Sequence, residues 1–313
     1  MIKLRALFAY CCASADNQGS GTITIKNDNR NGSKKTPHVA GQLEYDSDSN
    51  QGANKKSKPF KITAEEVALA PELILTVADG NVLPLLSEIV INAAGIAKGG
   101  RNKREGIVYV GSQKYKLSTK TSQQKLMNDL LLNDPTVGMR HCMFKYDTVL
   151  KNYWLKDLGE GSGTFIKIET EMKVKSGYII SFSDSHLLIT ISDGSLDNKT
   201  MFEGQEAPEK DTLILKFLNG PKMDQVFTFP KEEKVIKIGR MNDCGIKFDG
   251  NTLSRYQSSF EYRDGAWYAS DGFGEKTSTN GTWLFLGDFF EVKGGTLIKI
   301  GQTLFRTALK TRE

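Results

Sequence analysis

Residues 213–240 read LILKFLNGPKMDQVFTFPKEEKVIKIGR, and their residue pattern indicates the fold class. Three short runs rich in Leu, Ile, Val and Phe end at turn-forming residues, namely Asn219-Gly220, Pro230 and Gly239. Short apolar runs separated by Gly, Asn, Asp and Pro are typical of β-sandwiches and barrels. Similar runs continue to the end of the chain, and no helical apolar period persists for three turns. The stretch therefore predicts an all-β fold.

The first half of the chain carries a second copy of this pattern. The matching pairs are LILTVADGN (73–81) with LILKFLNGP (213–221), IVYVGS (107–112) with VIKIGR (235–240), and GTFIKI (163–168) with GTWLFL (281–286). Three matches in the same order indicate a tandem repeat. We predict two antiparallel β-sandwiches, over residues 72–191 and 212–309, joined by a polar linker at 192–211.

The N-terminal segment differs from the rest in composition. Residues 1–60 are basic and rich in Asn, Ser, Gly and Gln. Such a segment buries too little apolar surface to offset the entropy lost on ordering, so we predict a disordered basic tail. Residues 61–70, KITAEEVALA, predict a helical turn or two before Pro71.

Composition argues against several classes of protein. The net charge of +5 over 313 residues is small for a dedicated nucleic-acid-binding protein, and no apolar run approaches the length of a membrane span. The four cysteines form no CxxC pair and there are three histidines, so we predict no metal site and an intracellular protein with reduced thiols, cytoplasmic or nuclear. Phosphate-binding loops and hydrolase motifs are absent from the sequence, so we predict no catalytic residues, no cofactor and no enzyme activity.

The second copy concentrates polar residues on the loops between its strands. Arg240 ends an apolar run, LSRYQ follows at 253–257, and STNGTW follows at 278–283. Loops of a β-sandwich gather at its ends, so these groups can converge. Arg offers a fork of donors suited to phosphate oxygens, hydroxyls add further bonds, and an Asn amide can hold the main chain of an extended peptide.

These residues resemble those of the forkhead-associated (FHA) domain, a phosphothreonine-binding β-sandwich. The family pattern is Gly-Arg, then Ser-Arg-x-His, then Ser-x-Asn-Gly-Thr, and residues 213–309 follow it with Gln257 at the His position. The resemblance implies that Arg240 and Ser254 hold the phosphate, with Arg255 and Thr279 beside them. It implies that Asn280 bonds the peptide backbone, and that the methyl group of phosphothreonine is preferred.

The first copy resembles the family in its strands but not in its site. Gly138 and Met139 replace the Ser-Arg pair, Ser162 replaces the Asn, and His141 is kept. The position of the phosphate-binding Arg falls on Ser112 if the strands are matched, or on Gln124 if loop spacing is used. Neither residue is a cation, so we predict a degenerate copy without phosphate binding.

The resulting expectation is a phosphothreonine-dependent protein-binding module that acts through its second copy, with the first copy as scaffold. The alternative is a structural protein in which both sandwiches pack within a larger complex without phosphate. Self-association is also open, because threonines of the tail, such as Thr36 before Pro37, could be phosphorylated ligands.

Overall fold

The structure is a computed structural model that describes residues 61–98, 105–113, 115–117, 124–126, 128–194 and 208–311. These residues form almost only β-strands, most of them paired antiparallel, which confirms the predicted fold class. The tail predicted at 1–60, including Thr36, and most of the predicted linker at 192–211 lie outside the described residues.

The described strands form three larger sheets and one small hairpin. In chain order they are β1 (Glu72–Asp79), β2 (Glu88–Asn92), β3 (Gly95–Ile96), β4 (Ile107–Gly111), β5 (Tyr115–Leu117), β6 (Gln124–Leu126), β7 (Leu130–Leu131), β8 (Cys142–Asp147), β9 (Asn152–Asp157), β10 (Thr164–Lys167), β11 (Met172–Lys173), β12 (Ile179–Phe182), β13 (Ser185–Ile191), β14 (Leu213–Asn219), β15 (Val226–Phe229), β16 (Val235–Gly239), β17 (Ile246–Lys247), β18 (Ser258–Arg263), β19 (Ala266–Asp271), β20 (Trp283–Phe285), β21 (Phe290–Val292), β22 (Leu297–Ile300) and β23 (Thr303–Lys310). An eleven-stranded sheet has the order β15-β14-β13-β12-β20-β10-β22-β23-β1-β2-β3. Two five-stranded sheets have the orders β21-β9-β8-β4-β7 and β11-β19-β18-β16-β17, and β5 pairs with β6.

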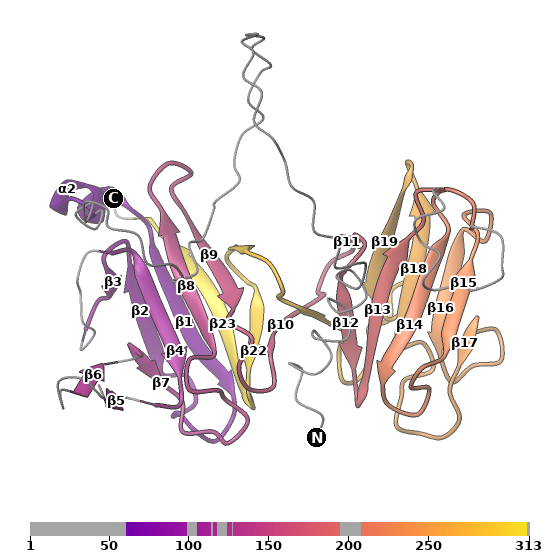
Figure 1. Cartoon of the computed structure of the whole chain (residues 1–313), viewed down its shortest axis with the longest axis horizontal. Coiled ribbons are helices and arrows are strands. Elements are labelled where there is room, and N and C mark those ends of the chain that lie inside the picture. The colour runs from indigo at the N-terminus through magenta and orange to yellow at the C-terminus, as the bar shows by residue number, and fades with distance from the viewer. Residues whose placement is uncertain are drawn as a thin grey trace, which may run out of the picture.

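The strands make two lobes that exchange their C-terminal strands. We call the sandwich around β1, β8 and β9 the first lobe, and that around β14, β18 and β19 the second lobe. The last strands of the chain belong to the first lobe, where β23 pairs with β1 and β21 with β9. Conversely, β13 pairs with β14 and β11 with β19 in the second lobe. Figure 1 shows this exchange as yellow strands β22 and β23 beside indigo β1, with the magenta β12 and β13 beside orange β14.

A pseudo-twofold relation connects the lobes through β10 and β20. These two strands pair antiparallel, with Ile166 opposite Leu284, and these are equivalent positions of the two sequence copies. On its other side β10 pairs with β22 of the first lobe, and β20 pairs with β12 of the second. The long sheet therefore runs unbroken between the lobes. Both side chains are buried in a core that extends into both lobes.

Because of the exchange, a lobe does not correspond to one copy of the sequence repeat. The sequence predicts two continuous sandwiches, whereas each observed lobe is completed by three strands from the other half. The physical reason is that the exchanged strands of the two copies have the same alternating apolar pattern, so each set fits either lobe. The ranges 72–191 and 212–309 stay a prediction of where the repeat divides.

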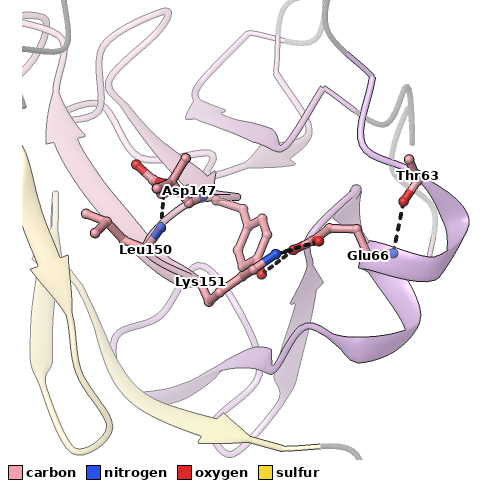
Figure 2. Close-up of polar contacts among 7 residues, drawn as sticks. Thr63, Glu66, Asp147, Leu150 and Lys151 are labelled. Atoms are coloured by element: carbon pink, nitrogen blue, oxygen red, sulfur yellow. Dashed lines mark hydrogen bonds and ion pairs between the residues drawn. The ribbon is translucent and has the colours of Figure 1, made fainter.

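A short helix packs on the first lobe at the end of its β8–β9 hairpin. Helix α2 (Ala64–Leu69) confirms the helical turn expected at 61–70, and the Thr63 hydroxyl caps it by accepting a hydrogen bond from the Glu66 backbone N–H at 3.1 Å. Figure 2 shows Lys151 reaching from the hairpin to Glu66, with its ammonium 2.6 Å from the carboxylate. This hydrogen bond lowers the pKa of Glu66.

Candidate functional site

Arg240 directly follows β16, where two backbone segments approach closely. A Cβ atom on Gly239 would lie 2.3 Å from the Arg255 carbonyl oxygen, so only glycine fits here without displacement. This approach lets the Arg240 backbone N–H donate to the Arg255 carbonyl at 3.2 Å. The exposed Arg240 side chain donates from Nη1 to Asn251 Oδ1 at 3.2 Å, which orients the guanidinium over the β17–β18 loop.

Ser254 and Thr279 join the two loops that carry the remaining predicted residues. The Ser254 hydroxyl oxygen accepts a hydrogen bond from the Thr279 backbone N–H at 2.9 Å and donates to the Thr279 hydroxyl at 3.3 Å. Arg255 is exposed next to this contact. The structure thus brings Arg240, Ser254, Arg255 and Thr279 to the same end of the second lobe.

Gln257 organises these loops from below. Its side chain is fully buried and donates from Nε2 to Ser278 Oγ at 2.9 Å and to the Gly281 carbonyl at 3.1 Å. Its Oε1 accepts from the Ser254 backbone N–H at 3.4 Å. An amide offers a donor and an acceptor at once, so Gln257 links both loops from the position where the family pattern has His.

Asn280 lies at the exposed tip of the second loop. Gly281 follows it with φ of +77°, a backbone conformation that favours glycine. The Asn280 carbonyl accepts a hydrogen bond from Trp283 Nε1 at 3.1 Å, so the indole packs against the loop rather than standing free. The Asn280 side chain remains exposed beside Thr279.

The acidic residue nearest to this cluster in sequence is already bound to other groups. Asp243 accepts hydrogen bonds from Lys237 and from the Tyr256 hydroxyl, at 3.1 Å for the latter. The Lys237 contact lowers the pKa of Asp243, and this carboxylate therefore orients the β16–β17 loop. Arg240 and Arg255 remain the exposed cations beside Ser254.

The structure identifies the equivalent positions of the first lobe. Parallel pairing places Gly111 beside Leu131 in β4–β7 as it places Gly239 beside Lys247 in β16–β17. A Cβ on Gly111 would lie 2.3 Å from the Met139 carbonyl, the same approach as at Gly239. Ser112 is therefore the counterpart of Arg240, and Gln124 is not, because its backbone belongs to the β5–β6 hairpin.

The first-lobe site lacks the cation, and its backbone leaves no room for side chains at the positions of Ser254 and Thr279. A Cβ on Gly138, the counterpart of Ser254, would lie 2.4 Å from the Glu160 Cβ. A Cβ on Gly161, the counterpart of Thr279, would lie 2.5 Å from the Gly138 nitrogen. The Glu160 carboxylate accepts a hydrogen bond from the Arg140 backbone N–H at 2.9 Å, which places a negative charge at this loop.

His141 takes the structural role of Gln257 in the first lobe. It is fully buried, and its Nδ1 accepts a hydrogen bond from the Gly138 backbone N–H at 3.1 Å. Its Nε2 lies 4.0 Å from Asp157 Oδ2. Burial raises the pKa of Asp157, while the Thr164 hydroxyl donates to its carboxylate at 2.7 Å.

Sequence reasoning missed three residues that shape the second-lobe site. These are Asn251, which accepts from Arg240, and the pair Ser278 and Asp271, joined at 2.6 Å. Ser278 opens the STNGTW motif, so its place in the pattern was the available signal. Nothing in the sequence pattern marks Asn251, because it lies in a polar loop outside the three motifs.

No group of three His, Cys, Asp or Glu side chains in the part of the chain that the structure describes is arranged to hold a metal ion. None of the helices among the described residues is long and apolar enough to cross a membrane.

Comparison with known families gives a match at two places. The FHA domain family matches residues 122–183 and residues 236–301; the second range contains all the predicted site residues, whereas Ser112 lies outside the first. No curated protein matches the chain. FHA domains are, as a family, modules that bind phosphothreonine in other proteins. Two stretches of the chain therefore match the FHA domain family, which is consistent with two FHA domains in tandem.

Proposed function

We propose that the chain binds phosphothreonine-containing proteins through the second-lobe site and that the first-lobe site binds no phosphate. In this proposal Arg240 and Ser254 hold the phosphate, Arg255 and Thr279 lie beside it, and Asn280 bonds the peptide backbone. Binding by Arg supplies charge-assisted hydrogen bonds that disappear when the ligand is dephosphorylated.

The observation that carries this proposal is the contact of Ser254 with Thr279 between the exposed Arg240 and Arg255. The Thr279 backbone N–H donates to the Ser254 hydroxyl at 2.9 Å without a ligand. The two loops should therefore lose little conformational freedom on binding. In the first lobe the corresponding residues are Ser112, Gly138, Met139 and Gly161, which offer no cation.

The test uses the full chain, because the second lobe contains strands from the first half. Fluorescence anisotropy would compare a degenerate phosphothreonine peptide pool with matched phosphoserine and unphosphorylated pools. We expect selective binding of the phosphothreonine pool. Arg240→Ala should weaken it at least about tenfold, since charge-assisted hydrogen bonds each contribute about 1.5–3 kcal/mol.

Arg263→Ala is the matched control. It removes an exposed arginine at the other end of β18, where the guanidinium lies over Tyr268. The affinity of Arg263→Ala for the phosphothreonine pool should stay close to that of the wild type. Equal affinity for all three pools, or undiminished binding by Arg240→Ala, would refute the proposal.

A second candidate is the structural role, which one observation favours. Each lobe is completed by strands from the other half, so the first copy is required to build the second whether or not it binds a ligand. We propose this scaffold role alongside peptide binding. Absence of binding to any of the three pools would leave the scaffold role alone.

We also propose that the protein acts inside the cell. Cys142 and Cys244 are free and buried, and burial raises the pKa of both thiols. Unpaired buried thiols suit a reducing compartment. Cys11 and Cys12 lie outside the described residues.

A further inference from the structure

A cavity of about 910 Å³ lies over the strands that connect the two lobes. Its floor is one face of the long sheet. Strand register places Lys299 beside Phe165, Trp283 beside Ser181, and Ser181 beside His186. Residues paired across neighbouring strands share a face of the sheet. The opposite face, with Ile166 and Leu284, belongs to the main core.

We call this cavity the bridge groove, and its floor is largely aromatic. Phe165 packs with Phe285 in a small cluster separate from the main core, and Trp283 packs against it. His186 stacks on Phe165 with the ring planes 13° apart. This surface exists because the exchanged strands place β10 and β20 side by side, so neither lobe alone would have it.

The bridge groove adjoins both sites, and Gly138 and Gly161 of the first-lobe site are among its lining residues. Asn280 lines the groove and is also the residue proposed to bond the backbone of the phosphopeptide. Thr279, the preceding residue, is hydrogen-bonded to Ser254 at 2.9 Å. An extended peptide rises about 3.3 Å per residue, so residues near the phosphothreonine reach the groove directly after passing Asn280.

The charges along the groove favour a cationic side chain. Its lining carries the carboxylates of Glu160 and Asp184 against the single ammonium of Lys299. His186 adds no charge at neutral pH, because burial lowers its pKa. The Lys299 ammonium lies over the Trp283 ring, 5.8 Å from its centroid, so that aromatic face already carries a cation of the protein itself.

We propose that the bridge groove binds a basic side chain, Lys or Arg, of the same phosphopeptide that occupies the second-lobe site. The cationic head lies near Glu160 and Asp184, while Lys299 keeps its place over Trp283. Both carboxylates come from the first half of the chain. The degenerate copy would then determine ligand specificity although it binds no phosphate itself. This inference rests on the proposed function.

The test compares two phosphothreonine peptide pools on the full chain by fluorescence anisotropy. One pool contains Lys and Arg at its random positions, and the other omits them. We expect the wild type to bind the basic pool roughly three- to tenfold more tightly, as two partly exposed charge pairs would give. The double variant Glu160→Gln/Asp184→Asn should lose this preference yet keep its affinity for the pool without basic residues.

The matched control removes the same two charges elsewhere. Glu261→Gln/Asp264→Asn changes the end of the β18–β19 hairpin and should keep the preference. Glu160→Gln retains an oxygen that can accept the Arg140 N–H, so the loop should stay folded. If both double variants keep or both lose the preference, the inference is wrong. Phosphothreonine binding without a basic preference would overturn this inference alone, whereas no binding of either pool would overturn the proposed function with it.

Discussion

The equivalent loops of the two lobes keep the same framework and differ in the side chains that they expose. Both have a glycine at the end of β4 or β16 that lets a loop approach within 2.3 Å of where a Cβ would be. Both have a buried side chain under the loops, His141 or Gln257. They differ at Ser112 and Arg240, the residues that follow the glycines.

The first-lobe site therefore lacks both the cation and the room for the hydroxyl side chains of the second lobe. In the second lobe Ser254 and Thr279 are in contact. The first lobe has glycines at these positions, and neighbouring atoms occupy the space that side chains there would need. The framework and the ligand-binding groups are therefore separable. Buried hydrogen bonds maintain the loops, and exposed residues decide what the loops bind.

The largest effect is expected from separating the two halves. A fragment of residues 208–311 lacks Phe182, Leu187 and Ile189, which are fully buried in the second lobe. Each such side chain contributes about 1.5–3 kcal/mol, so the loss is comparable with the 5–15 kcal/mol stability typical of a whole domain. We expect neither 61–194 nor 208–311 to fold alone, and a mixture to recover β structure by circular dichroism.

A designed disulfide tests the same exchange in the whole chain. Ile74 and Ala308 are paired neighbours on β1 and β23, and antiparallel partners have a Cα separation that suits a disulfide. Ile74→Cys/Ala308→Cys should form a bond within one monomer, visible by mobility on a non-reducing gel. A folded 208–311 fragment together with no such bond would mean that each half keeps its own last strands.

The next effect distinguishes the two lobes by matched glycine substitutions. Gly239→Ala and Gly111→Ala each place a Cβ 2.3 Å from a carbonyl oxygen. Overpacking of this kind costs about 1–3 kcal/mol, so both variants should unfold at lower urea concentration than the wild type. Gly239→Ala alone should weaken phosphothreonine peptide binding, by about tenfold for a disturbed charge-assisted bond. Equal binding loss in Gly111→Ala would show that the first-lobe site also takes part.

A smaller effect concerns the exchanged hairpins. His186 occupies the place that Leu304 has in the equivalent hairpin of the first lobe. Because burial lowers the pKa of His186 below its ordinary value of 6.5, the unfolded state binds more protons in this range. Stability should therefore fall as the pH decreases from 6.5 towards the folded-state pKa.

His186→Leu should remove this dependence. Urea denaturation of the wild type and variant at pH 7.5, 6.5 and 5.5 measures it, and the difference between the two proteins isolates this group. Parallel pH profiles in the two proteins would contradict the expectation.

The smallest expected effect is a graft that should fail. Ser112→Arg in an Arg240→Ala background restores a cation to the first lobe only. It should restore no phosphothreonine binding, because Gly138 and Gly161 offer no hydroxyl and Glu160 repels phosphate. Anisotropy with the phosphothreonine pool would measure this. Recovered affinity would mean that the charge alone separates the two lobes.

Much of the fold and the site could be predicted because local residue patterns carry them. The alternating runs around Val235–Gly239 specify strands, and the Asn280-Gly281 pair specifies a turn with positive φ. The choice between Ser112 and Gln124 could not be made from the sequence. It depends on the parallel pairing of β4 with β7 across an inserted hairpin, whose length confuses any count of spacing.

The strands, the repeat and the resemblance to FHA domains can be read from the sequence, because alternation, turn residues and motif spacing are local properties. Which half completes which lobe depends on long-range strand pairing. The hairpins β12–β13 and β22–β23 have interchangeable apolar faces, so their local pattern is satisfied in either sandwich. The pairing of β10 with β20, and the bridge groove above it, follow from that choice.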